Sequence, residues 1–174
     1  MDASWWKNHI MDAGPISLIM FFVGFFTSRF TMTKKEKKDL EQKRFENAKD
    51  LAESQNERFQ DFTATLKKYI ENASEPTFND FYDIATSGEK YFYQQAITCE
   101  AILSGNVDGT FRDQTLVPKI RETIQKSLPR FYDVLNDIAK KKGFSYEGKL
   151  ERKQYESLYQ VAEKYPMPGD KAPI

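Results

Sequence analysis

The pattern of apolar and polar positions divides the chain into one apolar run near the N-terminus and a series of amphipathic segments after it. Residues 13–28 carry no charged side chain and are bounded by Asp12 and Arg29. As a helix this run reaches about 24 Å, which is shorter than a hydrocarbon core of about 30 Å. We therefore predict a transmembrane helix over residues 14–33, with the Arg29 side chain extending to the lipid headgroups. The residues predicted to lie within the span are Ile16, Leu18, Ile19, Met20, Phe21, Phe22, Val23, Phe25 and Phe26.

Two other interpretations of the apolar run fit the sequence less well. A cleaved signal peptide needs a basic segment before the run and a small-x-small cleavage site after it, but Asp2 and Asp12 outnumber Lys7, and the run ends in Thr-Ser-Arg-Phe. A helix lying in the membrane interface needs a polar face, and residues 16–26 are apolar on every side apart from Ser17 and Gly24.

The charges that flank the run predict its orientation, because basic residues close to a span stay in the cytoplasm. Before the run the only basic side chain is Lys7, whereas the segment after it is rich in lysine. We predict an extracytoplasmic tail over residues 1–13 and a cytoplasmic C-terminal domain. The lysine cluster is interpreted as a topology signal, and contact with anionic lipid headgroups is the alternative. The residues predicted at the membrane interface are Trp5, Trp6, Arg29, Lys34, Lys35, Lys37 and Lys38.

Residues 33–74 contain neither Gly nor Pro and predict one long amphipathic helix. Its apolar stripe follows an unbroken heptad spacing, which favours packing against another helix or self-association. The first half of the stripe is weak, so we expect a basic helical stalk over residues 34–50 and a helical bundle over residues 51–165. The pattern leaves open whether this helix continues the transmembrane helix. The stripe consists of Phe45, Ala48, Ala52, Gln55, Phe59, Phe62, Leu66, Tyr69 and Ala73.

A second helix is predicted over residues 77–104, beginning with a capping box at Thr77 and Asp80. The short turn around Pro76 makes the two helices an antiparallel hairpin, which we expect to be the stability core. In this hairpin the stripe residues Phe59, Phe62 and Leu66 are predicted to face Phe81, Phe92 and Ile102. Gly88 lies on the apolar stripe, and its missing side chain is expected to allow close helix approach.

Three further helices are predicted over residues 115–127, 129–142 and 149–165, followed by a flexible tail over residues 166–174. Pro118 fits the first turn of one helix, whereas Pro129 either kinks one helix or separates two. No segment has the alternation of a β-strand. The predicted fold is therefore all-α, with one N-terminal transmembrane helix, a long amphipathic helix and a cytoplasmic helical bundle.

Composition and motifs restrict the chemistry. Acidic and basic residues balance to a net charge of zero, which does not favour nucleic acid as a partner. One cysteine and one histidine leave no cluster that predicts a metal site, and no catalytic or cofactor-binding motif is present. The sequence around Gly109 resembles a calcium loop, but Ser104 and Thr115 occupy its essential carboxylate positions. Cys99 lies on an apolar stripe and is expected to be buried.

The remaining candidates for chemistry are acidic and aromatic side chains on the predicted helices. Asp80 and Asp83 with Glu89, and Glu151 with Glu156, are interpreted as helix surface residues rather than acid/base pairs. Residues 91–93 form the densest aromatic cluster, and consecutive helical residues point to different sides, so at least one ring should be exposed.

These observations favour a non-enzymatic, membrane-anchored interaction or scaffold module whose bundle is presented to protein partners. Tyr91 and Tyr93 are the candidate partner surface, and the lipid bilayer and a protein partner or a second copy are the expected contacts. The alternative is an oligomerising membrane effector, whose Phe-rich span perturbs the bilayer when the cytoplasmic domain is triggered.

Overall fold

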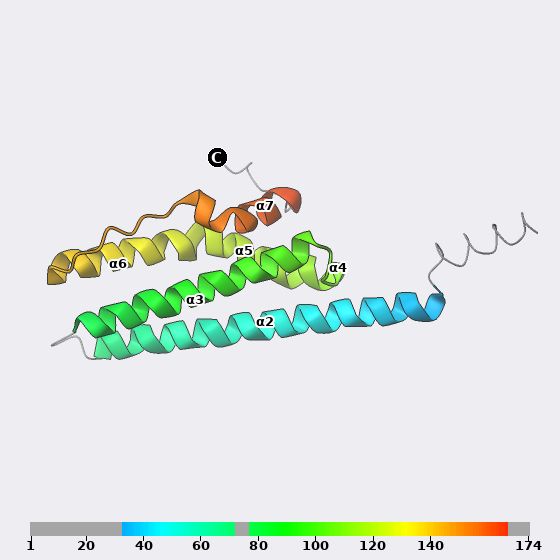
Figure 1. Cartoon of the computed structure of the whole chain (residues 1–174), viewed down its shortest axis with the longest axis horizontal. Coiled ribbons are helices and arrows are strands. Elements are labelled where there is room, and N and C mark those ends of the chain that lie inside the picture. The colour runs from blue at the N-terminus through cyan, green and yellow to red at the C-terminus, as the bar shows by residue number, and fades with distance from the viewer. Residues whose placement is uncertain (1–32, 72–76, 167–174) are drawn as a thin grey trace, which may run out of the picture. The chain divides into compact units, whose positions relative to one another are not determined.

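A computed structural model describes residues 33–71 and 77–166, and all of its regular elements are helices (Figure 1). No strand occurs in these ranges, which confirms an all-α fold for the described part of the chain. The chain divides into two units, Met1–Gln42 and Lys43–Ile174. The predicted transmembrane helix over residues 14–33 lies almost entirely outside the described residues.

The long amphipathic helix is α2, Lys34–Glu71, and it begins at a capping box. The Glu36 backbone N–H donates to Thr33 Oγ1 at 3.2 Å, and the Thr33 backbone N–H donates to Glu36 Oε2 at 2.7 Å. These bonds satisfy N–H groups that have no partner inside a helix. Thr33 therefore caps α2, which starts at Lys34.

Helix α3, Phe78–Leu103, begins at the predicted capping box. The Thr77 side chain accepts from the Asp80 backbone N–H at 3.3 Å, and Asp80 Oδ2 accepts from the Thr77 backbone N–H at 2.9 Å. The helix is followed by Ser104 and by Gly105, whose φ of 73° is a conformation that glycine adopts without strain. Both ends of this helix therefore lie within a residue of their predicted positions.

Helices α2 and α3 lie side by side and run antiparallel, as the sequence predicts (Figure 1). The Phe59 and Tyr91 rings are 5.5 Å apart between centroids near the middle of the pair. At one end Asn47 Nδ2 donates to the Asn106 carbonyl at 2.7 Å, before Leu51, where we predict the bundle to begin. Among the described residues of α2, only Ala48 and Gln55 are buried, so the contact is narrow.

The hydrophobic core lies mainly between α3, α6 and α7 rather than within the α2–α3 hairpin. Phe92 is 1% exposed, and its ring contacts those of Phe131 and Tyr155 at 5.1 Å and 6.2 Å. Phe62 contacts Tyr91 and Phe131 instead. The prediction that Phe92 faces the α2 stripe is therefore wrong, because Tyr91 is the α3 ring that packs against Phe59 and Phe62 of α2.

Residues 109–142 form one continuous helical path made of five pieces. Two π-helical turns each come shortly before a proline, one before Pro118 and one before Pro129. Proline has no N–H for the helix ladder and its ring displaces the preceding carbonyl, and a wider turn relieves both effects. Pro129 therefore neither separates two helices nor ends one. The pieces are α4 Gly109–Phe111, η1 Arg112–Leu116, α5 Val117–Glu122, η2 Thr123–Ser127 and α6 Leu128–Lys142.

Gly88 is a point of close approach between α3 and α6, which confirms its predicted role. A Cβ atom at Gly88 would lie 2.2 Å from Phe131 Cε2, well inside van der Waals contact. The Phe131 ring therefore occupies the space that any other side chain at position 88 would fill.

After α6 the chain returns in an extended segment, residues 144–151, to η3, Arg152–Tyr155, and α7, Glu156–Lys164 (Figure 1). The last helix begins later than position 149. Its C-terminus is held to α5 by Arg121, whose guanidinium donates to the Ala162 and Tyr165 carbonyls. Cys99 is buried as predicted, and this burial raises the pKa of its thiol.

Candidate functional site

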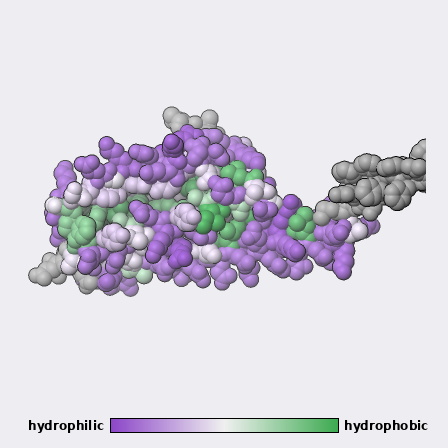
Figure 2. All heavy atoms as spheres, viewed as in Figure 1, coloured by the Kyte–Doolittle hydropathy of each residue, from purple (hydrophilic) through white to green (hydrophobic). Residues whose placement is uncertain are grey.

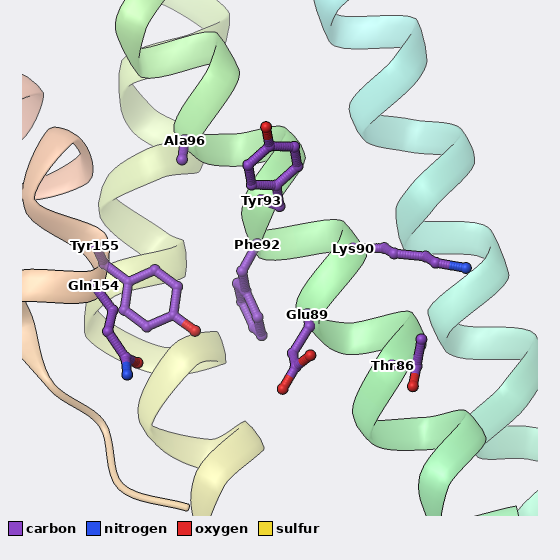
Figure 3. A pocket seen from close by; sticks show the side chains of 8 residues that line it. All are labelled: Thr86, Glu89, Lys90, Phe92, Tyr93, Ala96, Gln154 and Tyr155. Atoms are coloured by element: carbon purple, nitrogen blue, oxygen red, sulfur yellow. The ribbon is translucent and has the colours of Figure 1, made fainter.

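Two neighbouring surface hollows form a cleft between α3 and residues 146–155, which we call the tyrosine cleft. Figure 3 shows the first of these hollows. Their volumes are about 400 and 650 Å³, and they share Glu89, Gln154 and Tyr155. The first hollow is lined in addition by Thr86, Lys90, Phe92, Tyr93 and Ala96. The second is lined in addition by Tyr132, Tyr146, Glu147, Gly148, Lys149 and Glu151.

One wall of the tyrosine cleft is the extended segment after α6. The Phe144 backbone N–H donates to the Ala139 carbonyl at 2.9 Å, and Asn136 Nδ2 donates to the Gly148 carbonyl at 3.0 Å. A Cβ atom at Gly148 would lie 2.0 Å from the Tyr146 hydroxyl oxygen. Glycine at position 148 therefore leaves the space that the Tyr146 side chain occupies.

The hydroxyl groups of Tyr132 and Tyr155 are 2.9 Å apart and form a hydrogen bond at the base of the cleft. Burial is the main cause that raises the pKa of Tyr155, and its hydrogen bond with Tyr132 raises it further. Burial also raises the pKa of Tyr146, with smaller effects from Tyr132 and Glu89. Both phenols therefore stay protonated at neutral pH.

The opposite wall is α3, which presents charged and aromatic side chains at successive turns. Figure 3 shows Phe92 and Tyr155 facing one another, while Lys90 points away from Tyr155 toward α2. Tyr93 is 69% exposed at the rim. The carboxylate of Glu89 contributes to the raised pKa values of both Tyr146 and Tyr155, which places its negative charge close to the cleft.

A third hollow, which we call the apolar groove, lies between α2 and α6 over α3, with a volume of about 520 Å³. Ile84 and Tyr91 of α3 are buried at its base. On the α2 side, Phe59 is 45% exposed and Ile70 is 69% exposed. Arg130 is the charged residue among those that line the groove. The groove is lined by Phe59, Phe62, Leu66, Ile70, Ile84, Tyr91, Ser127, Arg130, Phe131 and Val134.

The structure separates the two tyrosines predicted as a partner surface. Tyr91 is 4% exposed, because its ring packs between α2 and α3 against Phe59 and Phe62. Its prediction as an exposed contact is wrong. Tyr93 is exposed and lines the tyrosine cleft, so one ring of the aromatic cluster does face outward, and its role toward a partner stays a prediction.

Several residues that line the tyrosine cleft were not predicted as site residues. Tyr132, Tyr146 and Tyr155 belong to different elements and carry no shared spacing that could reveal them. Glu89 was noted only as a possible acid/base residue. Figure 2 shows small hydrophobic areas on a mainly hydrophilic face, which suits local contacts rather than one large apolar surface.

Only some of the predicted membrane residues lie in the part of the chain that the structure describes. The span from Ile16 to Phe26, and Trp5, Trp6 and Arg29, lie outside the described residues. Lys34, Lys35, Lys37 and Lys38 are exposed on the first turns of α2. Among the helices that the structure describes, none combines the length and the apolar character that crossing a membrane requires.

Within the same described ranges, no three His, Cys, Asp or Glu side chains gather closely enough to hold a metal ion. Comparisons of the chain with models of protein families, with curated proteins and with solved structures found no match. The geometry of the tyrosine cleft and of the apolar groove is therefore the basis for a functional proposal.

Proposed function

We propose that the chain is a membrane-anchored helical interaction module, which presents its bundle to protein partners at the cytoplasmic face and performs no catalytic step. The anchor in this proposal is the predicted span over residues 14–33, and the basic residues after it support a cytoplasmic bundle. The observation that carries the docking role is the apolar groove, because Phe59 and Ile70 keep much of their apolar surface exposed beside it.

The shape of the apolar groove supports an amphipathic helix as its occupant. Phe59, Phe62, Leu66 and Ile70 follow one another at the three- and four-residue spacing of a single helix face. From Phe59 to Ile70 the helix rises about 16 Å, or roughly three helical turns. A partner helix placed between α2 and α6 would complete a helical bundle and cover these side chains.

The charge at the rim adds an expectation about the partner. Arg130 is exposed and has no hydrogen bond or ion pair with the other described residues. We expect the partner helix to carry a carboxylate near one end of its apolar face, where it would pair with this guanidinium.

Site-specific photocross-linking in intact cells tests the docking proposal. A photoreactive residue at position 70 should capture a helical segment of a partner, and the same residue at position 97 should not. Ile97 is a suitable control because it is also an exposed isoleucine, at 39%, and it lies on α3 outside the apolar groove. Ile70→Ser should abolish co-purification of that partner, whereas Ile97→Ser should preserve it. Equal co-purification by both variants would overturn the proposal.

A second experiment separates this function from an effector that acts on the bilayer. Residues 16–26 are replaced by a Leu/Ala segment of equal length, which keeps an anchor but removes the Phe-rich sequence. A tether keeps its function after this exchange. Loss of function with normal membrane insertion would instead favour an oligomerising effector.

A further inference from the structure

The tyrosine cleft has a distinctive charge arrangement that the apolar groove lacks. Glu89, Glu147 and Glu151 all line its second hollow, and the only basic side chain in that lining is Lys149. None of the three carboxylates has an ion pair with another residue in the described part of the chain. The second hollow therefore has an excess of negative charge, and its carboxylates have no ion pair among the described residues.

Aromatic surfaces surround these carboxylates. Tyr132, Tyr146 and Tyr155 line the same hollow, and Tyr93 lies at the rim of its neighbour. The faces of aromatic rings attract cations, and the attraction grows where water is partly excluded. Neutral tyrosines beside carboxylates are thus a combination that suits an organic cation.

A metal ion fits this arrangement poorly. The three carboxylates share a hollow of about 650 Å³, yet they are not among any described group close enough to bind one metal ion. A hollow of this size holds a flat, extended cation that meets the carboxylates from different sides.

We propose that the tyrosine cleft binds an arginine side chain from a basic segment of a partner protein. This inference rests on the proposed function, because it adds a second recognition element to a docking module. It is independent of the apolar groove, since the tyrosine cleft and the apolar groove share no lining residue.

Arginine suits the cleft better than lysine for two reasons. Its planar guanidinium stacks on tyrosine rings, and its forked N–H groups form paired hydrogen bonds with carboxylates. The ammonium of lysine is a compact, strongly hydrated charge, and it therefore loses more hydration free energy than a guanidinium on entering a partly buried hollow. The cleft should therefore discriminate between the two cations.

The test measures binding of fluorescein-labelled hexa-arginine, hexalysine and hexaglutamate peptides to the full-length chain in a nonionic detergent. Hexa-arginine should bind most tightly and hexaglutamate should not bind. Binding should weaken as salt increases, because exposed charges are screened. Equal affinity for hexa-arginine and hexalysine would overturn the specificity for arginine.

Two matched pairs of variants locate the binding site. Glu89→Gln should weaken hexa-arginine binding about tenfold, the loss expected for one charge-assisted contact. Glu57→Gln, the same change at an exposed position on α2, should leave binding unchanged. Tyr93→Ser should weaken binding, and Tyr82→Ser should not, since Tyr82 is 60% exposed on α3 but does not line the cleft.

The outcomes distinguish this inference from its alternatives. Equal losses for Glu89→Gln and Glu57→Gln would show general charge attraction and overturn the site. Displacement of hexa-arginine by spermine at equal charge concentration would assign the cleft to small polyamines and overturn the assignment to arginine. The peptide assay needs no native partner, so it can fail while the cross-linking at position 70 succeeds, and the reverse.

Discussion

Gln55 is the residue whose burial is hardest to reconcile with stability. Its side chain lies on α2 and is 0% exposed. Neither its amide nitrogen nor its amide oxygen has a hydrogen-bond partner among the described residues. Gln95 of α3 is equally buried, and its amide oxygen also lacks a partner, whereas its nitrogen donates to the Tyr91 hydroxyl at 2.9 Å. Buried polar groups without partners keep the cost of losing water.

We predict that Gln55→Leu stabilises the protein by about 1 to 3 kcal/mol, the cost of burying unpaired polar atoms. Thermal unfolding of the full-length chain in a nonionic detergent, followed by far-UV circular dichroism, measures the change. Gln60→Leu is the control, because it makes the same change at an exposed position of the same helix. A lower melting temperature for Gln55→Leu would show that the amide does have a partner in solution.

Gly88 supports a second prediction at the scale of the residue. Gly88→Ala should destabilise the protein by about 1 to 3 kcal/mol from overpacking, because the new Cβ would meet the Phe131 ring. The greater helix propensity of alanine, worth about 1 kcal/mol, offsets part of that cost. The net effect is a lower melting temperature in the same unfolding experiment.

The double variant Gly88→Ala with Phe131→Leu provides the control. If the ring causes the clash, the effect of Gly88→Ala should be smaller when Phe131 is already replaced, so the two changes are not additive. Strict additivity would mean that the helices separate readily at this point and that Gly88 is not a contact site.

The sequence predicted burial along each helix better than it predicted which helices face each other. It placed Phe92 and Cys99 inside correctly, because the apolar spacing of one helix depends only on its own sequence. It placed Phe92 among the residues that face α2, and Tyr91 on a partner surface, because α3 is buried on two sides. A helix that contacts α2 and α6 at once has a wide apolar face, and a single heptad stripe describes only part of it.

At the scale of the element, the starts of α2 and α3 were predicted well, whereas the start of the last helix and the interruptions near the prolines were not. The capping box at Thr77 is local chemistry that can be read from four residues. The π-helical turns before Pro118 and Pro129 depend on how the preceding turn widens, which the sequence leaves open. The sequence therefore left open whether Pro129 kinks one helix or separates two, and the structure has one continuous helical path over residues 109–142.

The capping box of α3 predicts a dependence of stability on pH. Hydrogen bonds from Thr77 lower the pKa of Asp80 below its ordinary value of 3.8, with a smaller contribution from Lys68. A carboxyl whose pKa is lower in the folded state stabilises the fold above its unfolded pKa, and this stabilisation is lost as pH falls through the folded pKa. Asp80→Asn should therefore lower the melting temperature at pH 7, and the difference from wild type should shrink below pH 3.8.

Asp83→Asn is the control for this prediction, since Asp83 is exposed on the same helix and takes no part in the cap. It should change the melting temperature little at either pH. If the difference between Asp80→Asn and wild type stays constant from neutral to acidic pH, the capping bonds do not depend on the charged carboxylate.

At the scale of the whole molecule, the tyrosine cleft shows why a site can escape sequence analysis. Its tyrosines come from α6, from the extended segment and from η3, and its carboxylates come from α3 and from that segment. Each residue alone has the appearance of an ordinary surface or core position. Only the return of residues 144–151 along α6 brings them together. The turn at Gly143 starts this return, but the local sequence of the turn does not determine where the following segment packs.

The orientation of the molecule in the membrane is the broadest prediction, and it rests on the basic residues that follow the predicted span. A reporter fused after Ile174 in a bacterial host should give cytoplasmic fluorescence and no alkaline phosphatase activity, because basic flanks stay in the cytoplasm. Replacing Lys34, Lys35, Lys37 and Lys38 with glutamine should shift part of the population toward phosphatase activity. The same change at Lys140, Lys141 and Lys142 should have no effect, since lysines far from a span contribute little to its orientation. Strong phosphatase activity of the unaltered fusion would contradict the cytoplasmic location, and with it the docking role proposed for the bundle.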